Sequence, residues 1–78
     1  MLQRTIHALE VVQGCSLVIF ETHDEAENGD MQHILVWFTK FNDKFYGDFV
    51  QIKEDTDLPE LVAVLKEQAT NTLTELNK

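Results

Sequence analysis

Residues 34–53 read ILVWFTKFNDKFYGDFVQIK, and this stretch decides the fold class of the chain. The segments Ile34–Phe41 and Phe45–Lys53 are rich in β-branched and aromatic residues, which predicts two β-strands. Asn42-Asp43 lies between them, and both residue types tolerate the left-handed conformations that tight turns need. The sequence therefore predicts an antiparallel hairpin at the centre of the fold.

The register of this hairpin has two solutions. A two-residue loop pairs Trp37 with Asp48. A three-residue loop with a bulge pairs Trp37 with Phe49 instead. The second register collects aromatic side chains on one face, where cross-strand pairs stabilise each other, so we expect it.

Two segments come directly before the hairpin. Residues 16–22, SLVIFET, are apolar and β-branched and predict a third strand. Residues 23–31 show no apolar periodicity and predict a mobile loop between this strand and the hairpin.

The N-terminal segment has two interpretations. Leu2, Ile6 and Leu9 are spaced like one face of a helix, and Gly14 suits the end of that helix. The pair Val11-Val12 could equally begin an extended segment. We expect a helix over residues 2–13.

The C-terminal third predicts a long helix. Its apolar residues recur at steps of 3, 1, 3, 4, 4 and 3, as on one helix face: Leu58, Leu61, Val62, Leu65, Ala69, Leu73 and Leu76. Asp57 can cap the N-terminus, and Glu60 three residues later completes a capping box. Pro59 is tolerated in the first turn. We expect this helix to span Leu58–Leu76.

Together these elements predict a single compact α+β domain over residues 1–78. The order is α-β-β-β-α, with a three-stranded antiparallel meander and a long C-terminal amphipathic helix. Both alternating sets of residues in the predicted strands are apolar, so both sheet faces carry large apolar groups. Helices cover one face; the second is either a homodimer or partner interface, or is closed by the N-terminal segment.

The charge balance limits the possible partners. The 78 residues hold 6 Lys and Arg against 14 Asp and Glu, a formal net charge of −8. This charge argues against direct nucleic-acid binding and against anionic membranes. The longest apolar run, residues 34–38, is too short to cross a bilayer, and no signal-peptide pattern opens the chain. Cys15 is the one cysteine and cannot form an internal disulfide, so we expect a cytoplasmic protein.

Acidic residues are expected to gather at one pole of the fold. In an antiparallel meander, the loop after the first strand and the junction before the last helix lie at the same edge. Lys53 is the only nearby basic residue for nine carboxylates: Glu21, Asp24, Glu25, Glu27, Asp30, Glu54, Asp55, Asp57 and Glu60. Such a pole can dock a basic protein or a divalent cation. In the alternative interpretation, Asp55, Asp57 and Glu60 favour the positive end of the helix dipole, and the remaining carboxylates belong to a solvated loop.

Six of the seven aromatic residues lie between positions 37 and 49. A platform for stacking nucleobases would need flanking basic residues, which are few here. Most of these aromatic side chains are therefore expected in the core. Trp37 and Tyr46 are the candidates for partner contacts, because such side chains are enriched at interaction hot spots.

Catalytic or metal-binding chemistry finds little support in the sequence. The three glycines are scattered and form no phosphate-binding loop. Cys15 could act as a nucleophile with His7, His23 or His33 as its base, but nothing supplies the third group that orients such a base. These residues also lack the close paired spacings of zinc sites. We predict no catalytic residue, no metal ligand and no cofactor.

The sequence thus predicts a small, acidic, non-enzymatic protein-binding module. It would be an inhibitor or adaptor that engages a basic protein, for example one that binds nucleic acid, through the acidic pole and an apolar sheet face. The expected partner-binding residues are Glu21, Asp24, Glu25, Glu27, Asp30, Glu54, Asp55, Trp37 and Tyr46. The alternative is a homodimeric structural or regulatory scaffold. A third hypothesis is a small enzyme or metal-binding protein that uses Cys15 or the histidines.

Overall fold

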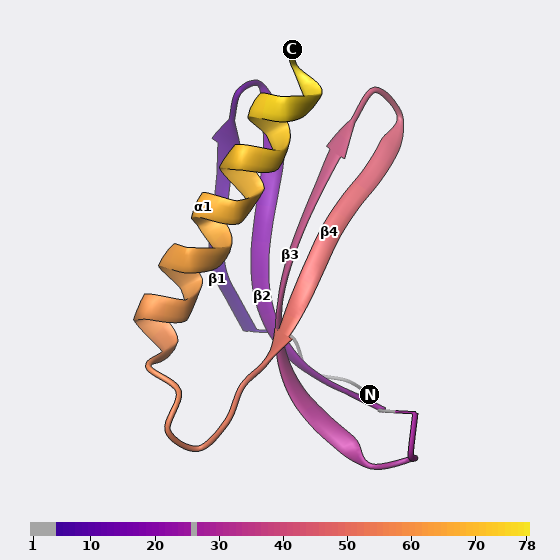
Figure 1. The fold of residues 1–78 in the computed structure, drawn as a ribbon, viewed down its shortest axis with the longest axis vertical. Coiled ribbons are helices and arrows are strands. Elements are labelled where there is room, and N and C mark those ends of the chain that lie inside the picture. Colours follow the sequence, from indigo (N-terminus) through magenta and orange to yellow (C-terminus); the bar gives the residue numbers. More distant parts are fainter. Residues whose placement is uncertain (1–4, 26) are drawn as a thin grey trace.

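The computed structural model describes residues 5–25 and 27–78, which form four strands and one helix (Figure 1). The elements are β1 (Thr5–Val12), β2 (Cys15–Glu25), β3 (Met31–Phe41), β4 (Lys44–Gln51) and α1 (Leu58–Leu76). Each strand pairs antiparallel with its neighbour in the sequence, so the sheet order is β1-β2-β3-β4. Helix α1 packs on one side of this sheet, against β1, β2 and β3. The fold is therefore α+β.

The predicted N-terminal helix and three-stranded meander are wrong, because β1 makes a fourth strand. Residues 2–4 of the expected helix lie outside the described residues. Gly14 does not end a helix; it forms a two-residue turn with Gln13, and their φ angles are 81° and 51°. Positive φ at both positions is typical of the hairpin turn that best matches strand twist. A short isolated helix has only marginal stability in water. As a strand, β1 instead provides hydrogen-bond partners for the backbone N–H and C=O groups along one edge of β2.

The register of the β3–β4 hairpin also differs from the expected one. Trp37 pairs with Asp48, which is the register of the two-residue loop. Asn42 and Asp43 have φ angles of 50° and 64°, so this turn too is left-handed at both central positions. Its twist matches that of the strands, and this match outweighs the gain from grouping the aromatic rings. Phe49 consequently lies on the opposite face of the sheet from Trp37.

Strands β2 and β3 replace much of the loop expected over residues 23–31. They pair as far as Glu25 and Met31. In the remaining turn, the backbone N–H of Asp30 donates to the side-chain oxygen of Asn28 over 3.1 Å. The tip of this hairpin extends past the end of β4 and projects from the lower end of the molecule (Figure 1).

Helix α1 has the predicted bounds. The Asp57 carboxylate accepts a hydrogen bond from the backbone N–H of Glu60 over 3.3 Å, and Pro59 lies in the first turn. In the second half, hydroxyls donate to carbonyl oxygens four residues earlier, from Thr70, Thr72 and Thr74. These poor helix formers are therefore satisfied within the helix. No helix in the described part of the chain has the length and apolar character that crossing a bilayer requires.

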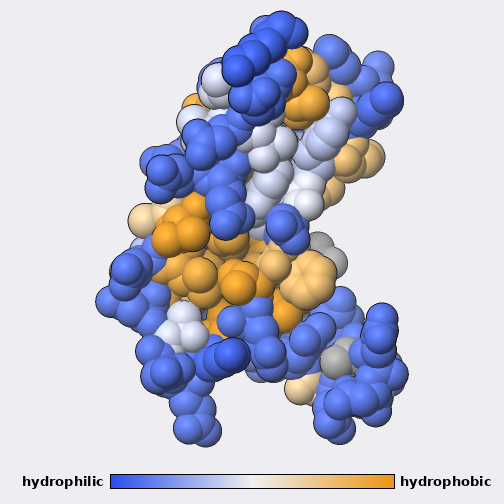
Figure 2. All heavy atoms as spheres, viewed as in Figure 1, coloured by the Kyte–Doolittle hydropathy of each residue, from blue (hydrophilic) through white to orange (hydrophobic). Residues whose placement is uncertain are grey.

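The core lies between α1 and the inner side of the sheet. Its buried cluster consists of Leu17, Ile19, Leu35, Trp37, Leu65 and Ala69. Apolar side chains also gather beside the N-terminal half of α1 (Figure 2), where Leu58, Leu61 and Val62 pack against this cluster. Over the other side of the sheet, residues 5–25 and 27–78 place no element.

Candidate protein-binding site

The side of the sheet that faces away from α1 exposes large apolar side chains. We call it the uncovered face; strand pairing places on it Ile6, Leu9, Val11, Val18, Phe20, Val36, Phe38, Phe45 and Phe49. Of the eight large hydrophobic residues exposed in the described chain, six lie here: Ile6, Leu9, Val11, Phe38, Phe45 and Phe49. A contiguous exposed apolar area of this kind marks an interaction surface.

The uncovered face is hollowed beside Gly47 of β4. Gly47 lies between Phe45 and Phe49 along β4, and it lines a hollow of about 580 Å³ together with Phe38 and Phe49. A Cβ atom at position 47 would lie 2.6 Å from the carbonyl oxygen of Trp37. No side chain fits there unless the strands move apart, so the hollow is a fixed feature beside two exposed phenyl rings.

The acidic residues lie at one end of the molecule, in two separate segments. We call eight of them the acidic end: Asp24, Glu25, Glu27 and Asp30 of the β2–β3 hairpin, then Glu54, Asp55, Asp57 and Glu60 around the start of α1. Both segments lie at the lower end in Figure 1, and hydrophilic side chains fill the two lower corners of Figure 2. All eight are exposed, and none forms an ion pair within the described residues.

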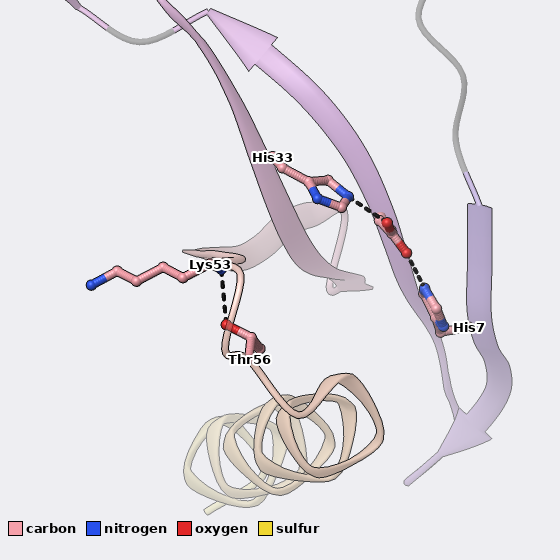
Figure 3. A network of polar contacts seen from close by, with 5 residues as sticks. His7, His33, Lys53 and Thr56 are labelled. Carbon is pink, nitrogen blue, oxygen red and sulfur yellow. Dashed lines mark hydrogen bonds and ion pairs between the residues drawn. The ribbon is translucent and has the colours of Figure 1, made fainter.

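Glu21 lies apart from the acidic end, because two histidines hold its carboxylate. Its Oε1 is 2.7 Å from Nε2 of His7 on β1, and its Oε2 contacts Nε2 of His33 on β3 (Figure 3). The ring of His23 stacks on that of His33, with centroids 4.4 Å apart. All three histidines of the chain thus gather around Glu21; we call these four residues the histidine cluster.

The histidine cluster changes the acidity of Glu21. The hydrogen bond from His7 lowers the pKa of the Glu21 carboxyl below its usual value of 4.5; partial burial opposes this shift, and His33 adds to it. The side chain is 21% exposed, so it is only partly open to solvent. Glu21 therefore links β1, β2 and β3 within the fold, and it does not act as a free surface charge.

We expect Glu21→Gln to lower the free energy of unfolding at neutral pH by about 1–2 kcal/mol, because it weakens charge-assisted hydrogen bonds. The pKa of Glu21 is lowered in the folded state, so its contribution is complete above pH 4.5 and is lost as the pH falls through the folded value. The difference between wild type and variant should therefore shrink on acidification. Urea denaturation at neutral and acid pH measures it. Glu75→Gln, at an exposed ion pair, is the control and should change stability by only a few tenths of a kcal/mol.

The two aromatic residues expected to contact a partner lie on the inner side of the sheet. Trp37 is 4% exposed and belongs to the core, and Tyr46 packs against that core half-buried. The exposed aromatic residues are Phe38, Phe45 and Phe49. Sequence reasoning could have identified these phenylalanines from a two-residue turn at Asn42-Asp43. Side chains alternate between the two sides of a strand, so this turn places Phe45 and Phe49 on the outer side.

The structure separates Cys15 from the histidines. Cys15 is half-buried at the start of β2, and Glu21 lies about 20 Å further along the same extended strand. This separation is far beyond the hydrogen-bond reach that a nucleophile and its base need. Over the described ranges, no three side chains of His, Cys, Asp or Glu are arranged to hold a metal ion.

The uncovered face and the acidic end are both open to solvent. The uncovered face offers apolar contact area, and the acidic end offers negative charge, whereas the histidine cluster holds strands together. Comparison with protein-family models, with curated proteins and with solved structures finds no match to this chain.

Proposed function

We propose that this chain is a non-enzymatic protein-binding module, an inhibitor or adaptor whose contact area is the uncovered face. The observation that carries the proposal is the exposure of six large apolar side chains on that face. Burying apolar surface is favourable by about 25 cal/mol per Å², so such an area is seldom left in water. A broad apolar face of this kind also suits a protein surface.

The acidic end supplies the charge preference in this proposal. Eight exposed carboxylates attract a basic protein and raise its rate of encounter, an effect that salt weakens. These carboxylates carry negative charge, as do the phosphate groups that a nucleic-acid-binding protein recognises. We propose the cytoplasm as the compartment, because Cys15 is the single cysteine and is unpaired.

A photo-crosslinking experiment tests whether the uncovered face binds a protein. The photoreactive residue p-benzoylphenylalanine replaces Phe49, which is 56% exposed on that face, or Val64, which is 41% exposed on α1. After irradiation in the source cells, position 49 should give a discrete protein adduct and position 64 should not. The absence of an adduct from position 49, or equal labelling from both positions, contradicts the proposal.

Neutralising the hairpin part of the acidic end should weaken binding to a basic probe. In a variant with Asp24→Asn, Glu25→Gln and Glu27→Gln, we expect about tenfold weaker binding of a labelled oligolysine peptide at low salt, since three exposed charge contacts contribute a few tenths of a kcal/mol each. The dependence of the affinity on salt should also become flatter. Fluorescence anisotropy over a salt series measures both effects.

The matched control removes the same charge elsewhere. Asp43→Asn, Glu67→Gln and Glu75→Gln lie at the β3–β4 turn and on the middle and last turns of α1, away from the acidic end (Figure 1). This variant has the same net charge as the first. If both variants lose affinity equally, net charge rather than the acidic end determines binding.

A further inference from the structure

We infer that the occupant of the uncovered face is a second copy of this chain. The inference rests on the proposed function, since it names the partner that binds there. The two sheets would pack face to face about 10 Å apart, giving four layers in the order helix, sheet, sheet, helix. The acidic ends of both copies would remain available to a basic protein.

The exposed area of the uncovered face suits a small dimer. Its three exposed phenylalanines are 39%, 64% and 56% exposed. This corresponds to about 300 Å², if a whole phenylalanine side chain covers about 200 Å². The three exposed residues of β1, each at least 60% exposed, roughly double that area. A stable interface needs about 800 Å² per partner. The half-buried residues Val18, Phe20 and Val36, which lie between these two groups, bring that area within reach.

The shape of the uncovered face is complementary to itself. A two-fold interface needs the same patch to supply both a projection and a recess. Phe45 and Phe49 project from β4, and the hollow of about 580 Å³ at Gly47 is lined by Phe38, Val36 and Phe49. A phenyl ring from one copy can therefore enter the hollow of the other, and the reverse contact forms by symmetry.

The charge of the uncovered face favours a second copy over a basic protein. Among the described strand residues on this face, Asp24 and Lys40 are the charged ones, and they lie at opposite ends. Asp24 and Asp48 are the carboxylates that line the hollow, and the exposed apolar residues of β1 and β4 on this face carry none that a basic partner could meet. A two-fold axis across the strands places the acidic ends at opposite ends of the dimer and brings Lys40 of one copy toward Asp24 of the other. Two chains that each carry a net charge of −8 can associate in this way.

The test measures the molar mass of the purified chain by size-exclusion chromatography with light scattering, at low and high salt. Wild type is expected at twice the mass of one chain at both salts. The double variant Leu9→Lys, Phe49→Lys puts two charges on the uncovered face, and its dimer dissociation constant should rise at least about 100-fold. The matched control Met31→Lys, Val64→Lys makes the same charge change at exposed apolar positions outside that face and should stay dimeric.

A second measurement does not depend on how the lysine variant folds. Purified chain with p-benzoylphenylalanine at position 49 should form a covalent dimer on irradiation, whereas the same group at position 64 should not. Circular dichroism of the lysine variants verifies that α1 is retained.

The outcomes separate this inference from the proposed function. A monomeric wild type without a covalent dimer overturns the inference. If position 49 then crosslinks a different protein in cells, the proposed function stands, and if it crosslinks none, both fail. A dimer that persists in the Leu9→Lys, Phe49→Lys variant also overturns the inference, because another surface then holds it.

Discussion

Replacing Trp37 with alanine is expected to lower the free energy of unfolding by about 3–5 kcal/mol. The side chain is 4% exposed and packs in the core cluster between the sheet and α1, so its removal leaves a large cavity. Domains have a total stability of about 0.05–0.15 kcal/mol per residue, so this loss is a large part of what a 78-residue chain has. The variant should therefore unfold at a much lower urea concentration than the wild type.

Trp37→Phe is the comparison that isolates packing. The indole Nε1–H of Trp37 is buried and has no hydrogen-bond partner within the described residues, and such a group costs about 1–3 kcal/mol. Phenylalanine retains most of the ring contact and removes this N–H, so we expect a net loss below about 1.5 kcal/mol. Urea denaturation followed by circular dichroism compares the variants, since both lack the single tryptophan. Equal losses would contradict the place of Trp37 in the core.

Gly47→Ala should destabilise the protein by about 2–3 kcal/mol. At most strand positions the same change would stabilise by about 0.5–1 kcal/mol, because alanine has less freedom to lose on folding. Here the added Cβ would lie 2.6 Å from the carbonyl oxygen of Trp37, and a backbone atom cannot turn aside. Strands β3 and β4 must therefore separate locally.

Gly14→Ala is the control for this steric effect. No atom lies within 4 Å of a Cβ added at Gly14, but its φ of +81° is unfavourable for alanine by about 1–2 kcal/mol. Gly14→Asn should recover much of that loss, because asparagine tolerates positive φ, whereas Gly47→Asn should be worse than Gly47→Ala. Denaturant midpoints for the four variants test this pattern. A neutral Gly47→Ala would contradict the close approach of β3 and β4.

The C-terminal helix could be predicted from sequence because its signals are local. The apolar spacing, the Asp57 cap and Pro59 all lie within the helix or next to it, and they define Leu58–Leu76 without reference to the rest of the chain. The existence of the central hairpin follows likewise from residue types. These elements carry their own evidence in a few neighbouring residues.

The first strand and the hairpin register depend on information that is not local. Residues 5–12 suit either a short helix or a strand. The strand forms because it pairs with an edge of β2 that would otherwise have no hydrogen-bond partner. The register depends on the left-handed backbone of Asn42 and Asp43, whose energy competes with aromatic pairing. Choosing the longer loop moves Phe49 to the inner side, so a one-residue difference in the turn determines which side chains a partner meets.

The candidate site was predictable in charge but not in shape. The acidic residues of two distant segments could be assigned to one end from an antiparallel meander alone. The contact between Glu21 and His33 could not, because it joins side chains on different strands whose register was unknown. The exposed phenylalanines required the correct turn length, although an apolar second face was expected.

The order of the strands sets the order in which the protein can fold. Each strand pairs with the preceding one, so the sheet can grow by successive hairpins, with little loop-closure entropy to overcome at any step. Helix α1 follows all four strands in the sequence, so a ribosome makes it after them. Until residues 58–76 emerge, the nascent sheet has apolar groups in water on both faces. The acidic residues of the β2–β3 hairpin are made before the helix, and repulsion between their like charges opposes association of neighbouring chains at that stage.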